Sequence, residues 1–129
     1  MKKILAVLAL VCGAVSAQAA ETDLIGTYAI KEKGAMKEFL KVSQDNGKFV
    51  VAEKMKNGTW RQSKEPLATV SRAQFEKLLK HPYSAPFDGL ANKGVAVFKV
   101  PGNFQEGKFK AESGFFMFFA FGPVELHKL

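Results

Sequence analysis

Residues 113–123, SGFFMFFAFGP, are the most unusual stretch of this 129-residue chain. Five of these eleven residues are Phe, and residues 114–124 carry no charge. A membrane-spanning helix needs about 20 apolar residues, so the stretch is too short to cross a bilayer as a helix. A strand of a membrane barrel alternates apolar and polar residues, whereas this stretch is apolar on both faces. The stretch therefore predicts a strand that is buried inside the protein.

A strand that is apolar on both faces has to be covered on both of them. Alternation places four side chains on the first face: Phe115, Met117, Phe119 and Phe121. We expect that face to line a core with five other residues: Tyr28, Val42, Val51, Phe98 and Phe109. The second face carries Phe116 and Phe118, and it needs a separate lid. Only one predicted helix is available to provide that lid.

That helix is predicted over residues 71–80, SRAQFEKLLK. Ser71 is followed three residues later by Gln74, which is the pattern of a capping box at a helix start. His81-Pro82 ends the helical pattern, because the residue before a proline disfavours helical geometry. One apolar stripe follows the helical period and would face the sheet: Phe75, Leu78 and Leu79.

Alternating apolar residues before and after the helix predict antiparallel strands. Asp45-Asn46-Gly47 indicates a hairpin turn, and Asn57-Gly58 indicates a two-residue type I′ turn. Residues 81–94 are rich in Pro and Gly and predict a loop, and Gly122-Pro123 is expected to break the Phe-rich strand. We predict a small α+β fold, in which a curved antiparallel sheet or partial β-barrel of about seven or eight strands carries one packed helix.

The first 19 residues have the pattern of a bacterial secretory signal peptide. Two lysines precede a short apolar run, and residues 17–19 form an A-x-A cleavage site. Cleavage near Ala19 would leave residues 20–129 as a single β-rich domain, without transmembrane segment. The only cysteine, Cys12, would leave with the signal, so the mature domain would be disulfide-free. We therefore expect a periplasmic or secreted protein.

The formal net charge is +7, and the basic residues are spread along the chain instead of forming a block. This distribution is typical of a solvated surface. Affinity for acidic envelope material, such as lipid head groups, is the alternative. We expect no nucleic-acid partner, because the sequence has no basic stripe and no recognition motif.

Residues 102–108, GNFQEGK, match the spacing of a phosphate-binding P-loop. Phe109 follows, however, where that motif requires Ser or Thr to bind magnesium. The next residues alternate like a strand, so no helix start is available to receive a phosphate. We interpret this segment as a hairpin turn.

The two histidines, His81 and His127, have no nearby cysteine and form no recognisable metal site. The acidic residues are scattered, and no nucleophile motif is present. We therefore expect no enzyme activity, no cofactor and no metal. Ser84 and Asp88 share a predicted loop with His81, which leaves a small hydrolase as one alternative.

Two short likenesses to known families occur. LIGTY resembles the G-x-W opening of lipocalin-like barrels at Gly26 and Tyr28, with Tyr in place of Trp. SGFF at Ser113 resembles the Ser-Gly motif of bacterial periplasmic lysozyme inhibitors, but the disulfide often found in that group cannot form in a mature chain without cysteine. Neither likeness assigns a family.

The predicted function is a non-enzymatic binding module of the bacterial envelope, with a hydrophobic ligand or an envelope protein segment held at the Phe-rich sheet. An alternative is an inhibitor or immunity-type protein that blocks an envelope enzyme through the loop 81–94. The candidate contact residues are Phe116, Phe118, Phe75, Tyr83, Phe87 and His81.

Overall fold

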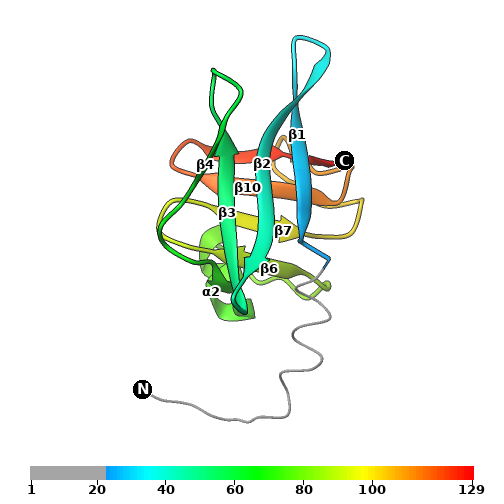
Figure 1. The fold of residues 1–129 in the computed structure, drawn as a ribbon. Coiled ribbons are helices and arrows are strands. Elements are labelled where there is room, and N and C mark those ends of the chain that lie inside the picture. The colour runs from blue at the N-terminus through cyan, green and yellow to red at the C-terminus, as the bar shows by residue number, and fades with distance from the viewer. Residues whose placement is uncertain (1–22) are drawn as a thin grey trace.

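A computed structural model of the chain describes residues 23–129, and the predicted signal peptide lies outside them. The described part contains two five-stranded antiparallel sheets, a two-stranded hairpin and one helix. The strands of the front sheet run across those of the rear sheet, and both sheets are open (Figure 1). This confirms the predicted α+β class. The described strands number twelve, more than predicted, and four of them have only two residues.

The front sheet has the strand order β12-β1-β2-β3-β4. Its members are β1 (Gly26–Glu32), β2 (Ala35–Asp45), β3 (Lys48–Lys54), β4 (Trp60–Gln62) and β12 (His127–Lys128). The turn between β2 and β3 is the predicted one. Asn46 and Gly47 have φ values of 53° and 80°, and a type I′ turn needs such left-handed conformations at both central residues.

The connection between β3 and β4 is longer than the predicted two-residue turn. It spans residues 55–59, and within them only Gly58 has a positive φ, of 89°. Oδ1 of Asn57 accepts hydrogen bonds from the backbone N–H of Thr59 at 3.0 Å and from its hydroxyl at 2.7 Å. The backbone N–H of Gly58 donates to the carbonyl oxygen of Met55 at 3.0 Å, so a backbone turn over residues 55–58, supplemented by the Asn57 side chain, replaces the type I′ turn and the predicted turn type was wrong. The prediction that Trp60 begins a strand is confirmed.

The rear sheet has the strand order β11-β10-β7-β6-β5. Its members are β5 (Ala68–Thr69), β6 (Asp88–Ala91), β7 (Ala96–Lys99), β10 (Phe115–Phe119) and β11 (Gly122–Glu125). The Phe-rich stretch supplies β10, which lies between β7 and β11. The prediction of a strand in this stretch is therefore confirmed.

Part of the predicted loop 81–94 is a strand, since β6 lies within it. Gly89 of β6 pairs with Phe98 of β7, and a Cβ atom at Gly89 would lie 2.7 Å from the Phe98 ring. Gly89 is therefore needed because the Phe98 ring lies close to the backbone of β6, and it does not indicate a loop.

The predicted break at Gly122-Pro123 is also displaced. The turn after β10 lies at residues 120–121, and Gly122 already begins β11. Pro123 is tolerated there because β11 is an edge strand, where a missing backbone N–H need not cost a ladder hydrogen bond.

Helix α2 (Arg72–Leu79) starts with the predicted capping box. The backbone N–H of Gln74 donates to Oγ of Ser71 at 3.2 Å, and the backbone N–H of Ser71 donates to Oε1 of Gln74 at 2.8 Å. Residues 102–108 include the predicted hairpin turn, since β8 (Gln105–Glu106) pairs with β9 (Phe109–Lys110).

The buried apolar residues form two groups. The inter-sheet core consists of Leu24, Tyr28, Leu40, Val42, Val51, Leu67, Leu90, Val97, Met117 and Leu126. The helix-side cluster, between the rear sheet, α2 and the β8–β9 hairpin, consists of Phe75, Phe98, Val100, Phe104, Ala111 and Phe116. Phe98 and Phe109 were predicted to join Tyr28, but they pack in or against the helix-side cluster. Phe98 pairs with Phe116 in the ladder, and directly paired residues share a face.

Candidate functional site

Strand β10 contributes to both groups of buried residues. Phe116 and Met117 are 1% and 2% exposed, and they enter the helix-side cluster and the inter-sheet core respectively. Phe119 packs against the inter-sheet core, and Phe118 packs against the helix-side cluster. Phe121, in the turn after β10, is 92% exposed. The predicted two-sided cover of this strand is therefore present, with Phe121 outside it.

Five of the six predicted contact residues come together on the helix side. The ring centroid of Phe75 lies 4.4 Å from that of Phe87, 5.1 Å from Tyr83 and 6.5 Å from Phe116. Phe118 packs against the same cluster. Phe75 and Phe116 are buried, so they pack beneath the other three residues and are not part of the accessible surface.

The helix was predicted to be the only cover of this face, but the structure shows further cover. The ring centroids of Phe104 and Phe109 lie 5.0 Å and 5.4 Å from that of Phe116. Both residues belong to the β8–β9 hairpin or the segment that leads into it. An eight-residue helix with one buried side chain cannot shield the face alone, so the hairpin and the loop after α2 complete the cover.

The loop after α2 is held by side chains of the helix. Nη1 of Arg72 donates to the carbonyl oxygens of Tyr83 at 2.7 Å and Ala85 at 3.0 Å, and its guanidinium lies over the Phe87 ring. The backbone N–H of Tyr83 donates to Oε2 of Glu76 at 2.9 Å. The loop therefore has a defined conformation on the helix.

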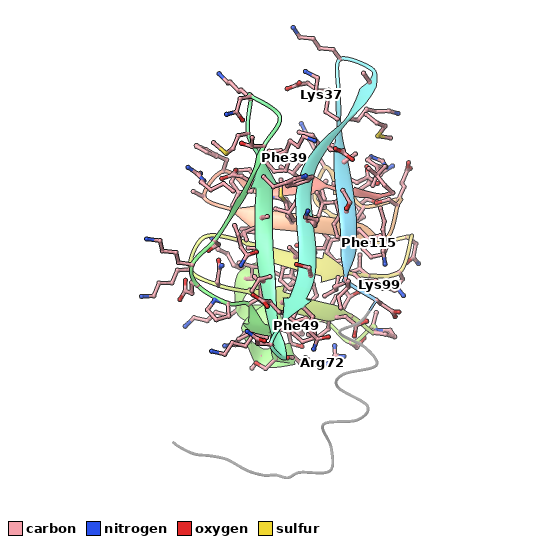
Figure 2. All side chains as sticks on the ribbon, viewed as in Figure 1. Lys37, Phe39, Phe49, Arg72, Lys99 and Phe115 are labelled. Carbon is pink, nitrogen blue, oxygen red and sulfur yellow. The ribbon has the colours of Figure 1, made fainter. Side chains whose placement is uncertain are left out.

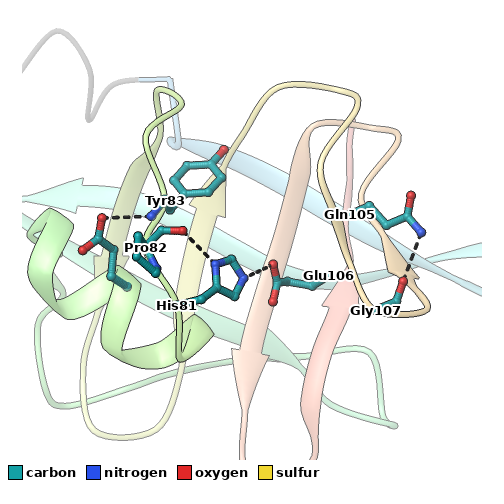
Figure 3. Close-up of polar contacts among 7 residues, drawn as sticks. His81, Pro82, Tyr83, Gln105, Glu106 and Gly107 are labelled. Atoms are coloured by element: carbon teal, nitrogen blue, oxygen red, sulfur yellow. Dashed lines mark hydrogen bonds and ion pairs between the residues drawn. The ribbon is translucent and has the colours of Figure 1, made fainter.

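His81, the sixth predicted residue, links the end of α2 to β8 (Figure 3). Nδ1 lies 2.7 Å from the carbonyl oxygen of Pro82, and Nε2 lies 2.6 Å from Oε1 of Glu106. A carbonyl and a carboxylate accept hydrogen bonds, so both ring nitrogens can donate in these contacts when the imidazole is protonated. The Pro82 carbonyl and the Glu106 carboxylate accordingly raise the pKa of His81.

This arrangement does not favour His81 as the base of a hydrolase. Both of its nitrogens are engaged with acceptors, so neither is free to take a proton from Ser84. Asp88 lies in β6, paired in the ladder with Lys99.

A small hollow of about 230 Å³ adjoins the helix-side cluster. It opens beside Phe118, between α2 and the β8–β9 hairpin. The lining residues are Leu78, Leu79, Phe104, Glu106, Phe109, Phe116, Phe118 and Pro123. Its volume is below the ~300–1,000 Å³ typical of small-molecule sites.

A larger cavity of about 360 Å³ lies on the opposite side of β10, between the two sheets. Met117 and Phe119 of β10 and Phe39 of β2 line it; Figure 2 shows Phe39 in the upper half of the front sheet. The other apolar lining residues are Leu40, Val51, Ala52, Gly94 and Val95, and the polar ones are Glu53, Arg61, Ser63 and Asn92. An apolar cavity of this volume with few polar groups is typical of a ligand site.

Asn92 organises one part of the polar rim of this cavity. Its Nδ2 donates to Oγ of Ser63 at 3.3 Å and to the carbonyl oxygen of Glu65 at 3.0 Å. Its Oδ1 accepts from the backbone N–H groups of Gly94 at 2.8 Å and Val95 at 3.1 Å. The amide has two donors and two acceptor positions, so its capacity is filled by the protein.

Glu53 and Arg61 supply the charges of the cavity wall. Glu53 pairs with Arg61 across β3–β4 and with Leu40 across β2–β3. Directly paired residues share a face, and Leu40 belongs to the inter-sheet core, so both charged side chains are on the inner face. Nη2 of Arg61 donates to Oε1 of Glu53 at 2.7 Å.

None of the six predicted contact residues lines this larger cavity. Alternation correctly placed Met117 and Phe119 on one face, but that face was expected to be filled. The pairing of Glu53 with Arg61 depends on the register across the long β3–β4 connection. If the length of that connection had been known, the pairing of Glu53 with Arg61 beside Leu40 would have indicated a polar rim next to the apolar core.

Within residues 23–129, no group of three or more His, Cys, Asp or Glu side chains is arranged to hold a metal ion. Over the same range, the one helix is too short to cross a bilayer.

No family model, no curated protein and no solved structure matches this chain.

Proposed function

We propose that the protein is an exported, non-enzymatic binding module of the bacterial envelope that holds one small hydrophobic or amphipathic molecule between its two sheets. The observation that carries this proposal is the 360 Å³ cavity beside the Phe-rich strand. Its lining combines an apolar interior with a short polar rim, which is how small-molecule sites are usually built. Its volume is near the lower limit of such sites, so it suits a single chain or ring system better than a two-chain lipid.

The position of the cavity explains why the Phe-rich strand would bind a hydrophobic molecule on its inter-sheet face and not on its helix-side face. Phe116, on the other face, is 1% exposed and is covered by the rings of Phe104 and Phe109. Met117 and Phe119, by contrast, border space that another molecule can fill. Apolar surface exposed in such a concave site gains free energy when a ligand removes it from water, at about 25 cal/mol per Å².

The neutral dye N-phenylnaphthylamine tests this proposal, because its fluorescence rises when it enters an apolar site. Val95→Phe fills the cavity and should weaken dye binding strongly. Leu79→Phe, the matched variant, adds similar bulk beside the helix-side hollow and should leave dye binding unchanged. A wild-type protein that does not bind the dye, or a dye affinity lowered only by Leu79→Phe, would contradict the proposal.

A second candidate is the inhibitor or immunity function through the loop after α2. The observation that favours it is the anchoring of this loop by Arg72, Glu76 and His81. A loop that is already ordered loses less conformational entropy on binding. Arg72→Gln should then weaken inhibition of a purified envelope enzyme, while Lys37→Gln, in the distant β1–β2 hairpin, should not. Equal inhibition by both variants would remove this candidate.

A further inference from the structure

We infer that the ligand of the inter-sheet cavity carries a carboxylate, and that Arg61 binds it at the mouth while the apolar part lies against Met117 and Phe119. This inference rests on the proposed function and adds the chemical class of the ligand. The occupant would be a single-chain amphiphile, such as a medium-chain fatty acid.

The side chains along one row of the front sheet change from apolar to charged. Leu40, Glu53 and Arg61 are direct neighbours across β2, β3 and β4. Leu40 is 4% exposed, whereas the side chains of Glu53 and Arg61 are 43% and 66% exposed. The row therefore passes from apolar core to a charged end at solvent. An amphiphile placed along this row would meet apolar surface at its tail and charge at its head.

The polar residues of the rim differ in their free hydrogen-bonding capacity. All hydrogen-bonding positions of the Asn92 side chain are occupied by protein partners. Oγ of Ser63 is hydrogen-bonded to Asn92 and to the backbone of Glu65. A guanidinium has five N–H donors in a planar fork, and the contact with Oε1 of Glu53 uses one of them. Arg61 therefore has the larger capacity to receive an acceptor group from a ligand.

The sign of the charge selects a carboxylate. Arg61 is more exposed than Glu53, so a ligand that arrives at the mouth meets the cation first. The chain has a formal net charge of +7, and residues 20–129, without Lys2 and Lys3, have +5; this positive charge favours the approach of anions. A phosphate would bring up to two negative charges beside Glu53, whereas a carboxylate brings one and fits the guanidinium fork with two parallel hydrogen bonds.

A purely structural role for the pair has to be distinguished from this one. β4 is an edge strand, and inward-pointing charges on edge strands hinder pairing with other chains. In that case Arg61 would affect aggregation, but it would not make binding depend on the head group of a ligand.

The experiment is calorimetric titration of the purified protein with decanoic acid, decanol and decylamine, each below its micellar concentration. We expect the acid to bind up to about fivefold more tightly than the alcohol, because an ion pair with an exposed guanidinium is worth at most about that factor. Arg61→Gln should remove the preference and leave alcohol binding unchanged. Glu53→Gln should strengthen binding of the acid, because it removes the competing carboxylate.

Lys37→Gln is the matched control, because Lys37 also forms an exposed ion pair, with Glu32 at 2.9 Å, but is not itself one of the residues that line the cavity. It should keep the full preference for the acid.

Two outcomes separate the inference from the proposed function. If the acid binds no more tightly than the alcohol, or if Arg61→Gln keeps the preference, the carboxylate assignment is overturned although the cavity still binds. If neither N-phenylnaphthylamine nor any of the three amphiphiles binds, the proposed function fails as well.

Discussion

The two faces of β10 differ in how completely they are filled. On the helix side, Phe116 packs against four other rings, those of Phe75, Phe98, Phe104 and Phe109. On the inter-sheet side, Met117 and Phe119 border a cavity of about 360 Å³. The strand is equally apolar on both faces, so its composition does not cause the difference.

The difference follows from what covers each face. The helix-side cover can adapt, because α2, the loop after it and the β8–β9 hairpin are short segments joined by polar contacts such as His81–Glu106. The inter-sheet cover is a second sheet, whose strands are held by their ladder and cannot close around one side chain. An aromatic cluster that leaves only a small hollow of about 230 Å³, and a larger cavity of about 360 Å³, therefore lie on opposite sides of one strand.

The strongest test of this comparison is Phe116→Ala. It removes a fully buried ring from a filled cluster, so we expect a loss of about 3–5 kcal/mol in the free energy of unfolding, measured by urea denaturation. Phe121→Ala is the control, because the Phe121 side chain is 92% exposed and its loss should cost less than about 0.5 kcal/mol. Similar losses in the two variants would show that the cluster is not tightly filled.

Gly89→Ala tests the same cluster by adding an atom. The new Cβ would lie 2.7 Å from the Phe98 ring, so we expect overpacking to cost about 1–3 kcal/mol. Val95→Phe adds more atoms but directs them into the inter-sheet cavity, so its loss should be smaller. If the Val95 variant is the less stable one under the same urea titration, the two sides do not differ as described.

Ser71→Ala tests the helix that covers the cluster. It removes the acceptor for the N–H of Gln74, and loss of such a cap costs about 1 kcal/mol. Thermal unfolding followed by circular dichroism would measure it. Ser71→Asn keeps a capping side chain and should restore most of the stability; no recovery would argue against the cap.

The smallest expected effect concerns the His81–Glu106 contact and its dependence on pH. The Pro82 carbonyl and the Glu106 carboxylate raise the pKa of His81 above 6.5 in the folded protein. The contribution of His81 to stability is therefore complete below about pH 6.5 and is lost as the pH rises through the raised value.

Comparison with His81→Gln measures this contribution. The wild type should exceed the variant in stability at about pH 5.5, and the difference should shrink by about pH 9. Both proteins can be compared by urea denaturation at each pH. A difference that is independent of pH, or that grows with pH, would contradict a cationic His81.

Much of the fold could be predicted because its signals are local. The helix start at Ser71, the turn at Asn46-Gly47 and the strand character of the Phe-rich stretch each depend on residues a few positions apart. The predicted contact residues also came together, because most of them flank α2 or lie on one face of β10. The loop 81–94 and the turn at Asn57 were harder to predict. Gly89 is required by a close contact with the Phe98 ring, and the backbone turn between β3 and β4 is closed from Gly58 to Met55, one residue earlier than a two-residue turn at Asn57-Gly58 would be.

The sequence alone determined that a doubly apolar strand, one capped helix and hairpin turns exist, because periodicity and turn chemistry act over short distances. Only the tertiary structure decided that Phe98 joins the helix side and that Glu53 and Arg61 end the row that starts at Leu40. Strand register and the meeting of two sheets depend on residues far apart in the chain, so no local pattern specifies where the packing leaves a cavity.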